Sequence, residues 1–243
     1  MRQTVLIACI LLMGCFAVAA LAAPLRVCLL SGSEEYKSDV SLAAFKEYLE
    51  KHFDMECTLL KAVGFEELPG LEALEKCDVS LFFTRRLRTD GEDLERVKKY
   101  GQSGKPIVAV RTASHGFQNW LEFDKEILGG NYHNHFPEGP VQTAVPTAEA
   151  EKHPVMKGVR TIESEYSLYK TAPVASDVTV LMNASIPNEA PQPAVWVREY
   201  RGARVFYTSL GGPKDFENAQ FRKLLANALC WAARQEVREL KRR

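Results

Sequence analysis

The feature that most constrains the fold is an alternation of short apolar runs with amphipathic segments in the first half of the chain. The runs lie at 25–30, 55–60, 78–84 and 106–110. Each has the length of a buried strand, and the segments between them carry leucines and aromatic residues at helical spacing. This order predicts parallel strands, right-handed crossovers and helices on both faces of the sheet. We therefore expect an α/β three-layer sandwich with a mainly parallel sheet.

The second half of the chain predicts further strands and a closing helix. Strands are expected at 161–169 and 178–183, and a hairpin at 194–200 and 203–209 turns around Arg201-Gly202. Apolar residues at helical spacing predict a final helix over 216–240. Between these parts, residues 117–146 are rich in Gly, Pro, Asn, His and aromatics, and irregular segments of this length inside a domain are often functional.

The length and the charge of the chain indicate a globular protein of one domain. The chain has 243 residues, 46% of them hydrophobic, which is enough for one domain with a substantial core. Basic and acidic residues number 31 each. Because the net charge is zero, the chain lacks the sustained positive field that binding to nucleic acid or to an anionic membrane requires.

The first residues have the pattern of an export signal. Arg2 precedes a nearly unbroken apolar run at 5–18, and Ala20-Leu21-Ala22 has the small residues of a cleavage site. We expect residues 1–22 to be a signal peptide and 23–243 the mature domain, exported to the periplasm or the cell exterior and free of the membrane. A lipoprotein box at 12–15 and an uncleaved apolar anchor remain alternatives.

The remaining cysteines do not form a disulfide pattern. Cys28, Cys57 and Cys77 fall on or beside predicted strands, and Cys230 lies in the last helix. These are positions typical of small buried apolar residues. We expect free, inert thiols.

Polar side chains follow the predicted strands at the edge where ligands bind in parallel sheets. They are Tyr36, Arg85 and Arg86, Arg111, Ser114 and His115, and Ser209. Gathered together they predict a cationic crevice, to which a helix beginning near Ser114 would add partial positive charge. An anionic or polyhydroxylated small molecule suits it. The alternative is that these arginines pair with glutamates and hold the loops together.

A second group lies in the irregular segment, where Asn131, Tyr132, His133 and His135 follow Gly129-Gly130. Polar groups among aromatic rings suit a sugar, whose hydroxyls take hydrogen bonds while its apolar face stacks on a ring. The two histidines, two residues apart, share a face in an extended strand and are alternatively metal ligands. No third ligand has a fixed spacing, so we expect no metal and no cofactor.

A third group contains Glu163, Glu165, Tyr166 and Tyr169. The two glutamates share one face of the predicted strand, and a carboxylate opposite His115 could act as a base or orient the imidazole. We therefore take His115 and Glu165 as the candidate catalytic pair and Tyr169 as a substrate-binding residue. The alternative is that these residues are solvent-exposed positions of the strand without a role in catalysis or binding.

Five motifs in order resemble the trehalose-utilisation (ThuA-like) family. They are GKP running to SHG at 104–116, LGGNYHNH at 128–135, HPVMKGV at 153–159, RVFYTSLG at 204–211 and FRKLL at 221–225. The resemblance covers nearly the whole mature chain. It implies a flavodoxin-like fold of the class I glutamine amidotransferase-like superfamily, and it implies that His115, His133 and His135 occupy the positions where the family's histidines cluster.

The resemblance also shows what this chain lacks. Amidotransferases of that superfamily carry a Cys on the sharp turn after the strand that corresponds to 106–110, and a His-x-Glu after the strand that corresponds to 204–208. Here Arg111 or a neighbour stands at the first position and Ser209-Leu210-Gly211 at the second. Family members often keep a His after that Ser-Leu-Gly, where this chain has Gly212. Without a thiolate and its base, glutamine hydrolysis by that route is excluded.

Function is predicted at the level of a ligand class. The first hypothesis is an exported protein that processes a sugar or oxidised sugar, with His115 as general acid or base and Arg85 and Arg111 on the substrate. The second is a sugar-binding protein without turnover, and the third is a metal-dependent hydrolase that uses His133 and His135. The partner expected in the first two is a small-molecule carbohydrate, and the sequence leaves catalysis and oligomeric state open.

Overall fold

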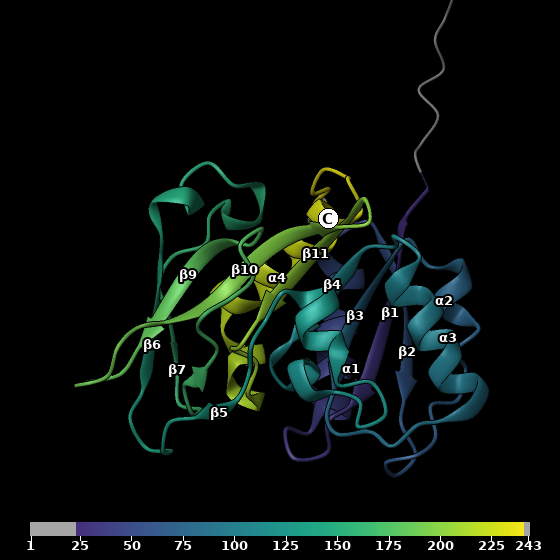
Figure 1. Ribbon diagram of the computed structural model, residues 1–243. Coiled ribbons are helices and arrows are strands. Elements are labelled where there is room, and N and C mark those ends of the chain that lie inside the picture. The colour runs from purple at the N-terminus through teal and green to yellow at the C-terminus, as the bar shows by residue number, and fades with distance from the viewer. Residues whose placement is uncertain (1–22, 241–243) are drawn as a thin grey trace, which may run out of the picture.

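The structure is a computed structural model that describes residues 23–240 of the 243. Its middle layer is a nine-stranded sheet in the order β2-β1-β3-β4-β11-β10-β9-β6-β7, with a separate two-stranded sheet β5-β8 (Figure 1). The strands are β1 Leu25–Gly32, β2 Met55–Lys61, β3 Val79–Thr84, β4 Ile107–Val110, β5 Asn134–His135, β6 Gln142–Pro146, β7 Ile162–Ser164, β8 Tyr169–Lys170, β9 Thr179–Ser185, β10 Gln192–Tyr200 and β11 Ala203–Thr208. The α-helices are α1 Ser38–His52, α2 Ala73–Lys76, α3 Gly91–Gln102 and α4 Ala219–Ala232.

The expected α/β fold is confirmed, and its sheet has two parts. The strands β2, β1, β3, β4 and β11 are parallel neighbours. From β11 onward the sheet continues through β10, β9, β6 and β7 in antiparallel pairs. In Figure 1 the parallel part stands on the right and the antiparallel part extends to the left.

Helices cover both faces of the parallel part because its strands alternate their buried side chains. Leu29, Leu81 and Val108 pack on one face with apolar residues of α1 and α4. Leu30 and Phe82, on the opposite face, pack with apolar residues of α2 and α3. Strands that are buried on both faces are typical of parallel sheets, and the expected three layers are present.

Two predicted elements differ from the structure. The closing helix is α4, shorter than 216–240 at both ends, because the Asn218 side chain caps it by accepting from the Gln220 N–H at 2.8 Å and Arg234 takes a left-handed φ of 57°. The strand expected at 161–169 is interrupted between β7 and β8, where the Ser167 carbonyl turns to accept a hydrogen bond from the buried Arg111.

The four cysteines among residues 23–240 are free, as expected. Burial raises the pKa of Cys57 to about 12 and that of Cys230 to about 11, so both thiols stay protonated. Cys77 differs, because a hydrogen bond with Cys28 lowers its pKa. Within residues 23–240, no helix is long and apolar enough to cross a membrane. The predicted signal peptide, with Cys9 and Cys15, lies outside the described residues.

Candidate functional site

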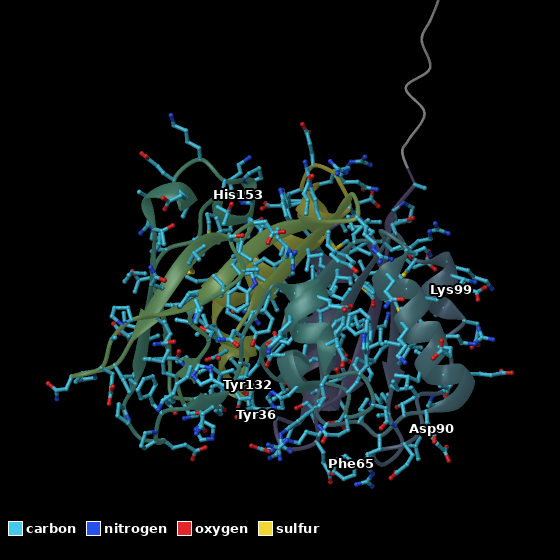
Figure 2. All side chains as sticks on the ribbon, in the orientation of Figure 1. Tyr36, Phe65, Asp90, Lys99, Tyr132 and His153 are labelled. Atoms are coloured by element: carbon cyan, nitrogen blue, oxygen red, sulfur yellow. The ribbon has the colours of Figure 1, made fainter. Side chains whose placement is uncertain are left out.

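The loops after β1, β3, β4 and β11 meet at one edge of the sheet, where hydrogen bonds join them. The Arg85 N–H donates to the Gly32 carbonyl at 2.9 Å, and the Thr112 hydroxyl donates to Ser33 Oγ at 3.1 Å. The β5–β8 sheet brings the segment around Tyr132 to the same edge. In Figure 2, Tyr36 and Tyr132 lie close to each other along this edge. The predicted convergence of the strand-end loops is confirmed.

Arg111 stands on a sharp turn directly after β4. Its φ is 46°, a left-handed conformation that is uncommon for a residue other than glycine. Residues Arg111–His115 form a 3₁₀ turn, so the helix expected to begin near Ser114 is absent. This correction removes the partial charge that a helix dipole would have supplied. The turn has the position and strain of a nucleophile elbow, but its residue is a cation and not a nucleophile.

The Arg111 side chain is completely buried and bonded to protein groups. Its guanidinium donates to the Ser209 carbonyl at 2.7 Å, to the Tyr36 hydroxyl at 3.2 Å, and to the carbonyl and hydroxyl of Ser167, each at 3.2 Å. Three aromatic rings surround it, with centroids 4.4 Å away for Tyr169, 4.7 Å for Tyr36 and 5.6 Å for Tyr166. Such contacts favour a buried cation. Arg111 therefore clamps three loops together from inside.

His115 lies next to Tyr169, one of the three rings around Arg111. Its ring stacks on Tyr132 with centroids 4.5 Å apart and an interplanar angle of 20°, and Tyr169 lies 6.1 Å away. Its Nδ1 is 3.1 Å from Ser114 Oγ. Burial, followed by the charges of Arg86 and Arg85, lowers the pKa of His115 to about 3. The imidazole is therefore neutral across the physiological range, which suits a general base or a hydrogen-bonding group.

Two arginines follow β3 and differ in their partners. Arg85 forms an ion pair with Glu35 at 2.5 Å, which is the loop-holding alternative that the sequence left open. Arg86 has a φ of 49°, and its N–H donates to the His115 carbonyl at 2.8 Å. Its side chain is exposed and makes no ion pair or hydrogen bond with any residue from 23 to 240. Within the described part of the chain, Arg86 is thus an unpaired cation beside His115.

Asp124 holds the loop of Tyr132 and was not foreseen from the sequence. It is buried in the π-helix Phe123–Leu128, and its Oδ2 accepts from the Tyr132 N–H at 2.8 Å. Burial raises its pKa to about 6. A Cβ at Gly130 would lie 2.2 Å from Asp124 Oδ1, so glycine is needed for this approach. The Gly129-Gly130 pair was the only sequence signal of such close packing.

Asp215 holds the turn after β11, as Asp124 holds the loop of Tyr132. Its Oδ2 accepts from the Gly211 N–H at 2.8 Å, the Gly212 N–H at 2.9 Å and the Ser164 hydroxyl at 3.0 Å. A Pro followed two residues later by an acid is the signal of a helix-start turn that could have indicated it. A Cβ at Gly212 would lie 1.9 Å from the Tyr166 ring. The Tyr166 ring thus fills the space that a histidine at this position would need.

Nine of the twelve predicted site residues lie together at this edge. They are Tyr36, Arg85, Arg111, Ser114, His115, Tyr132, His135, Tyr169 and Ser209. The hydroxyl of Ser209 is buried without a partner in the described part of the chain.

The other three predicted residues have separate partners. Glu165 is exposed and pairs with Lys214 at 2.6 Å, and among residues 23–240 it makes no hydrogen bond or ion pair with the His115 imidazole. His133 is exposed, with its Nδ1 2.8 Å from the Asn131 carbonyl, and the Asn131 amide donates to the Ala172 carbonyl at 3.5 Å. Among residues 23–240, no three His, Cys, Asp or Glu side chains are grouped so that they could hold a metal ion.

Comparisons with known proteins agree with the motifs. A model of the ThuA family, described as trehalose utilisation, matches residues 26–232. The chain belongs to the ThuA family. This confirms the resemblance and links the chain to a carbohydrate-related role. None of the curated proteins matches it.

Solved structures give this ThuA protein relatives in fold. A ThuA-like protein from Bacteroides uniformis has a TM-score of 0.65 at 22% identity and covers 90% of this chain and 95% of its own. One from Parabacteroides merdae has a TM-score of 0.68 at 17% identity, covering 88% and 91%. A GMP synthase subunit from Thermoplasma acidophilum has a TM-score of 0.57 at 12% identity, covering 88% and 96%. The last supports the expected amidotransferase-like, flavodoxin-like fold.

Proposed function

We propose that this ThuA protein is exported and that it binds or processes a sugar or an oxidised sugar at the edge that carries His115. The observation that supports this best is the neutral imidazole of His115, stacked on Tyr132 and flanked by Arg85 and Arg86. Hydrogen-bonding groups beside aromatic rings are the usual components of a sugar site.

A cavity whose lining contains none of the twelve predicted site residues adjoins the His115 turn through Ser33. It has a volume of about 340 Å³ at the carboxyl ends of β1 and β2, and Ser33, Glu34, Asp39 and Phe65 contribute to its lining. Ser33 connects it to the His115 turn, because its hydroxyl accepts from Thr112. Hydroxyl, carboxylate and aromatic groups together suit a polyhydroxylated ligand.

The test is a panel of disaccharides and keto-sugars incubated with wild type, His115→Ala and His133→Ala, with products followed by chromatography and binding by calorimetry. We expect binding or turnover that His115→Ala reduces by about 10²-fold or more where proton transfer is involved. His133→Ala is the control, since His133 is exposed and its ring hydrogen-bonds the Asn131 carbonyl of its own loop. Equal behaviour of wild type and His115→Ala would remove the proposed role.

The same panel separates the alternatives. Saturable binding without product after long incubation favours a sugar-binding protein without turnover. Loss of activity in His133→Ala and with chelator favours the metal-dependent hydrolase, for which the described residues provide no third ligand.

A further inference from the structure

The hydrogen bonds around His115 favour one tautomer of its neutral ring. The Ser114 hydroxyl donates to the Arg111 carbonyl at 3.2 Å, and the Tyr207 hydroxyl donates to the same oxygen at 2.8 Å, which its two lone pairs allow. Because the single hydroxyl proton of Ser114 is donated to the Arg111 carbonyl, Ser114 Oγ accepts a hydrogen bond from His115 Nδ1 at 3.1 Å. Nδ1 therefore carries the hydrogen and Nε2 carries the lone pair.

The Nε2 atom is available to a ligand. It makes no hydrogen bond with any group in residues 23–240, and it is not among the buried polar atoms that lack a partner there. The ring itself is held by the Tyr132 stack and by Ser114. A fixed, neutral acceptor at the carboxyl edge of the sheet suits an O–H donor of a ligand.

The charges beside this acceptor are positive. Arg85 is neutralised by Glu35, and Arg111 is buried among its own partners. Arg86 is exposed and unpaired within the described residues, and its backbone is fixed to the His115 carbonyl. Arg86, Arg85, Arg111 and His135 are the charged groups that act on the pKa of His115, and all four lower it. The edge therefore offers an acceptor next to an unneutralised guanidinium.

We propose that the ligand of this site is a sugar acid, whose carboxylate pairs with Arg86 while a neighbouring hydroxyl donates to His115 Nε2. The inference rests on the proposed sugar function and narrows its ligand class. A guanidinium binds a carboxylate by two parallel hydrogen bonds, which are stronger than those of neutral groups. A neutral sugar satisfies the acceptor and leaves Arg86 unpartnered.

The test uses matched pairs that differ in one group: methyl glucuronide against methyl glucoside, and methyl galacturonide against methyl galactoside. Calorimetry at low salt measures binding to wild type, Arg86→Gln and Arg96→Gln. We expect at least one acid to bind about ten-fold or more tightly than its neutral twin. Arg86→Gln removes most of that preference. Arg96→Gln keeps it, because Arg96 lies on α3 and pairs with Glu75.

The outcomes separate the two proposals. Neutral sugars that bind as tightly as their acids overturn the sugar-acid inference and leave the sugar function standing. A preference for acids that survives in Arg86→Gln overturns the assignment of the carboxylate to Arg86. If no member of either pair and no sugar of the earlier panel binds, both proposals fail together.

Discussion

Arg111 and Arg86 begin from similar positions and end in opposite environments. Each follows a parallel strand at the same edge of the sheet, and each has a left-handed backbone, with φ values of 46° and 49°. Arg111 is fully buried, with three tyrosine rings and four hydrogen bonds around its guanidinium. The Arg86 side chain is exposed and has no partner in the part of the chain that the structure describes.

The difference shows how burial divides two like residues between structure and binding. A buried cation must be surrounded by acceptors and rings, because its desolvation is otherwise too costly. An exposed cation loses little by lacking a partner and stays available to a ligand. The tyrosine rings and the hydrogen-bond acceptors around the Arg111 guanidinium form a cage. Much of this cage comes from two segments in the second half of the chain, 164–170 and 209–212. Through Arg111 these segments are fixed to the parallel part of the sheet.

The largest expected effect separates these two arginines by stability. Arg111→Met leaves the Ser209 carbonyl, the Ser167 hydroxyl and the Tyr36 hydroxyl without the guanidinium that donates to them, and each such buried group costs about 1–3 kcal/mol. We expect the free energy of unfolding to fall by about 3–5 kcal/mol. Arg86→Met, the matched control, should change it by less than about 0.5 kcal/mol. Urea denaturation of both variants measures this, and equal stabilities would contradict the clamp.

The tyrosine cage can be broken from its other side at Gly212. A Cβ there would meet the Tyr166 ring at 1.9 Å, so Gly212→Ala forces the ring out of its place. We expect a loss of about 1–3 kcal/mol in the free energy of unfolding, as for other overpacked sites. In a Tyr166→Ala background the same substitution should cost much less. A cost that is the same in both backgrounds would show that the ring is not the obstacle.

Asp124 extends the comparison to the loop that packs on His115, because it is buried and has no ion-pair partner among residues 23–240. Its pKa is raised by burial to about 6, so between roughly pH 4 and pH 6 the folded state holds a proton that the unfolded state releases. Its contribution to stability is therefore complete below about pH 4 and is lost as the pH rises through 6. Asp124→Asn removes this dependence and keeps an oxygen to accept from Tyr132.

The measurement is the difference in unfolding free energy between wild type and Asp124→Asn at pH 4.5 and at pH 7.5. We expect Asp124→Asn to gain on wild type as the pH rises, by at most about 3 kcal/mol for a shift of about two pKa units. His115 titrates in the opposite sense: its lowered pKa means that its contribution is lost as the pH falls from about 6.5 towards 3. Both proteins contain His115, so its contribution cancels. A difference that does not change with pH would contradict the raised pKa.

The parallel part of the fold could be predicted because its signal is local. The helical spacing of apolar residues between the first two runs predicts α1, and the runs at 78–84 and 106–110 predict β3 and β4. Since parallel strands end at the same edge, the positions of Arg85, Arg111 and His115 on one side followed directly. The antiparallel order of β10, β9, β6 and β7 could not be derived, because it depends on pairings between distant short segments.

The orientation of single side chains was beyond the sequence for the same reason. Glu165 pairs with Lys214, 49 positions further along, and the cage of Arg111 requires Ser167 to break a predicted strand. Asp124 has no periodic signal at all, since its function depends on the missing side chain of Gly130. In each case the deciding partner is remote in sequence and is chosen by packing.

The smallest expected effect tests whether Arg86 acts on His115 as a nearby charge. Burial is the main cause of the low pKa of His115, and the charge of Arg86 comes second. In Arg86→Gln the pKa should therefore rise while staying well below the ordinary value of about 6.5. Imidazole NMR resonances followed from pH 7.5 downward, assigned by their loss in His115→Gln, measure it, with Arg96→Gln as the control. Added salt should reduce the difference, because an exposed charge is screened and burial is not. A His115 resonance that titrates near pH 6.5 in wild type would mean that the imidazole is exposed, and the distinction between a fixed acceptor and a free cation would then be lost.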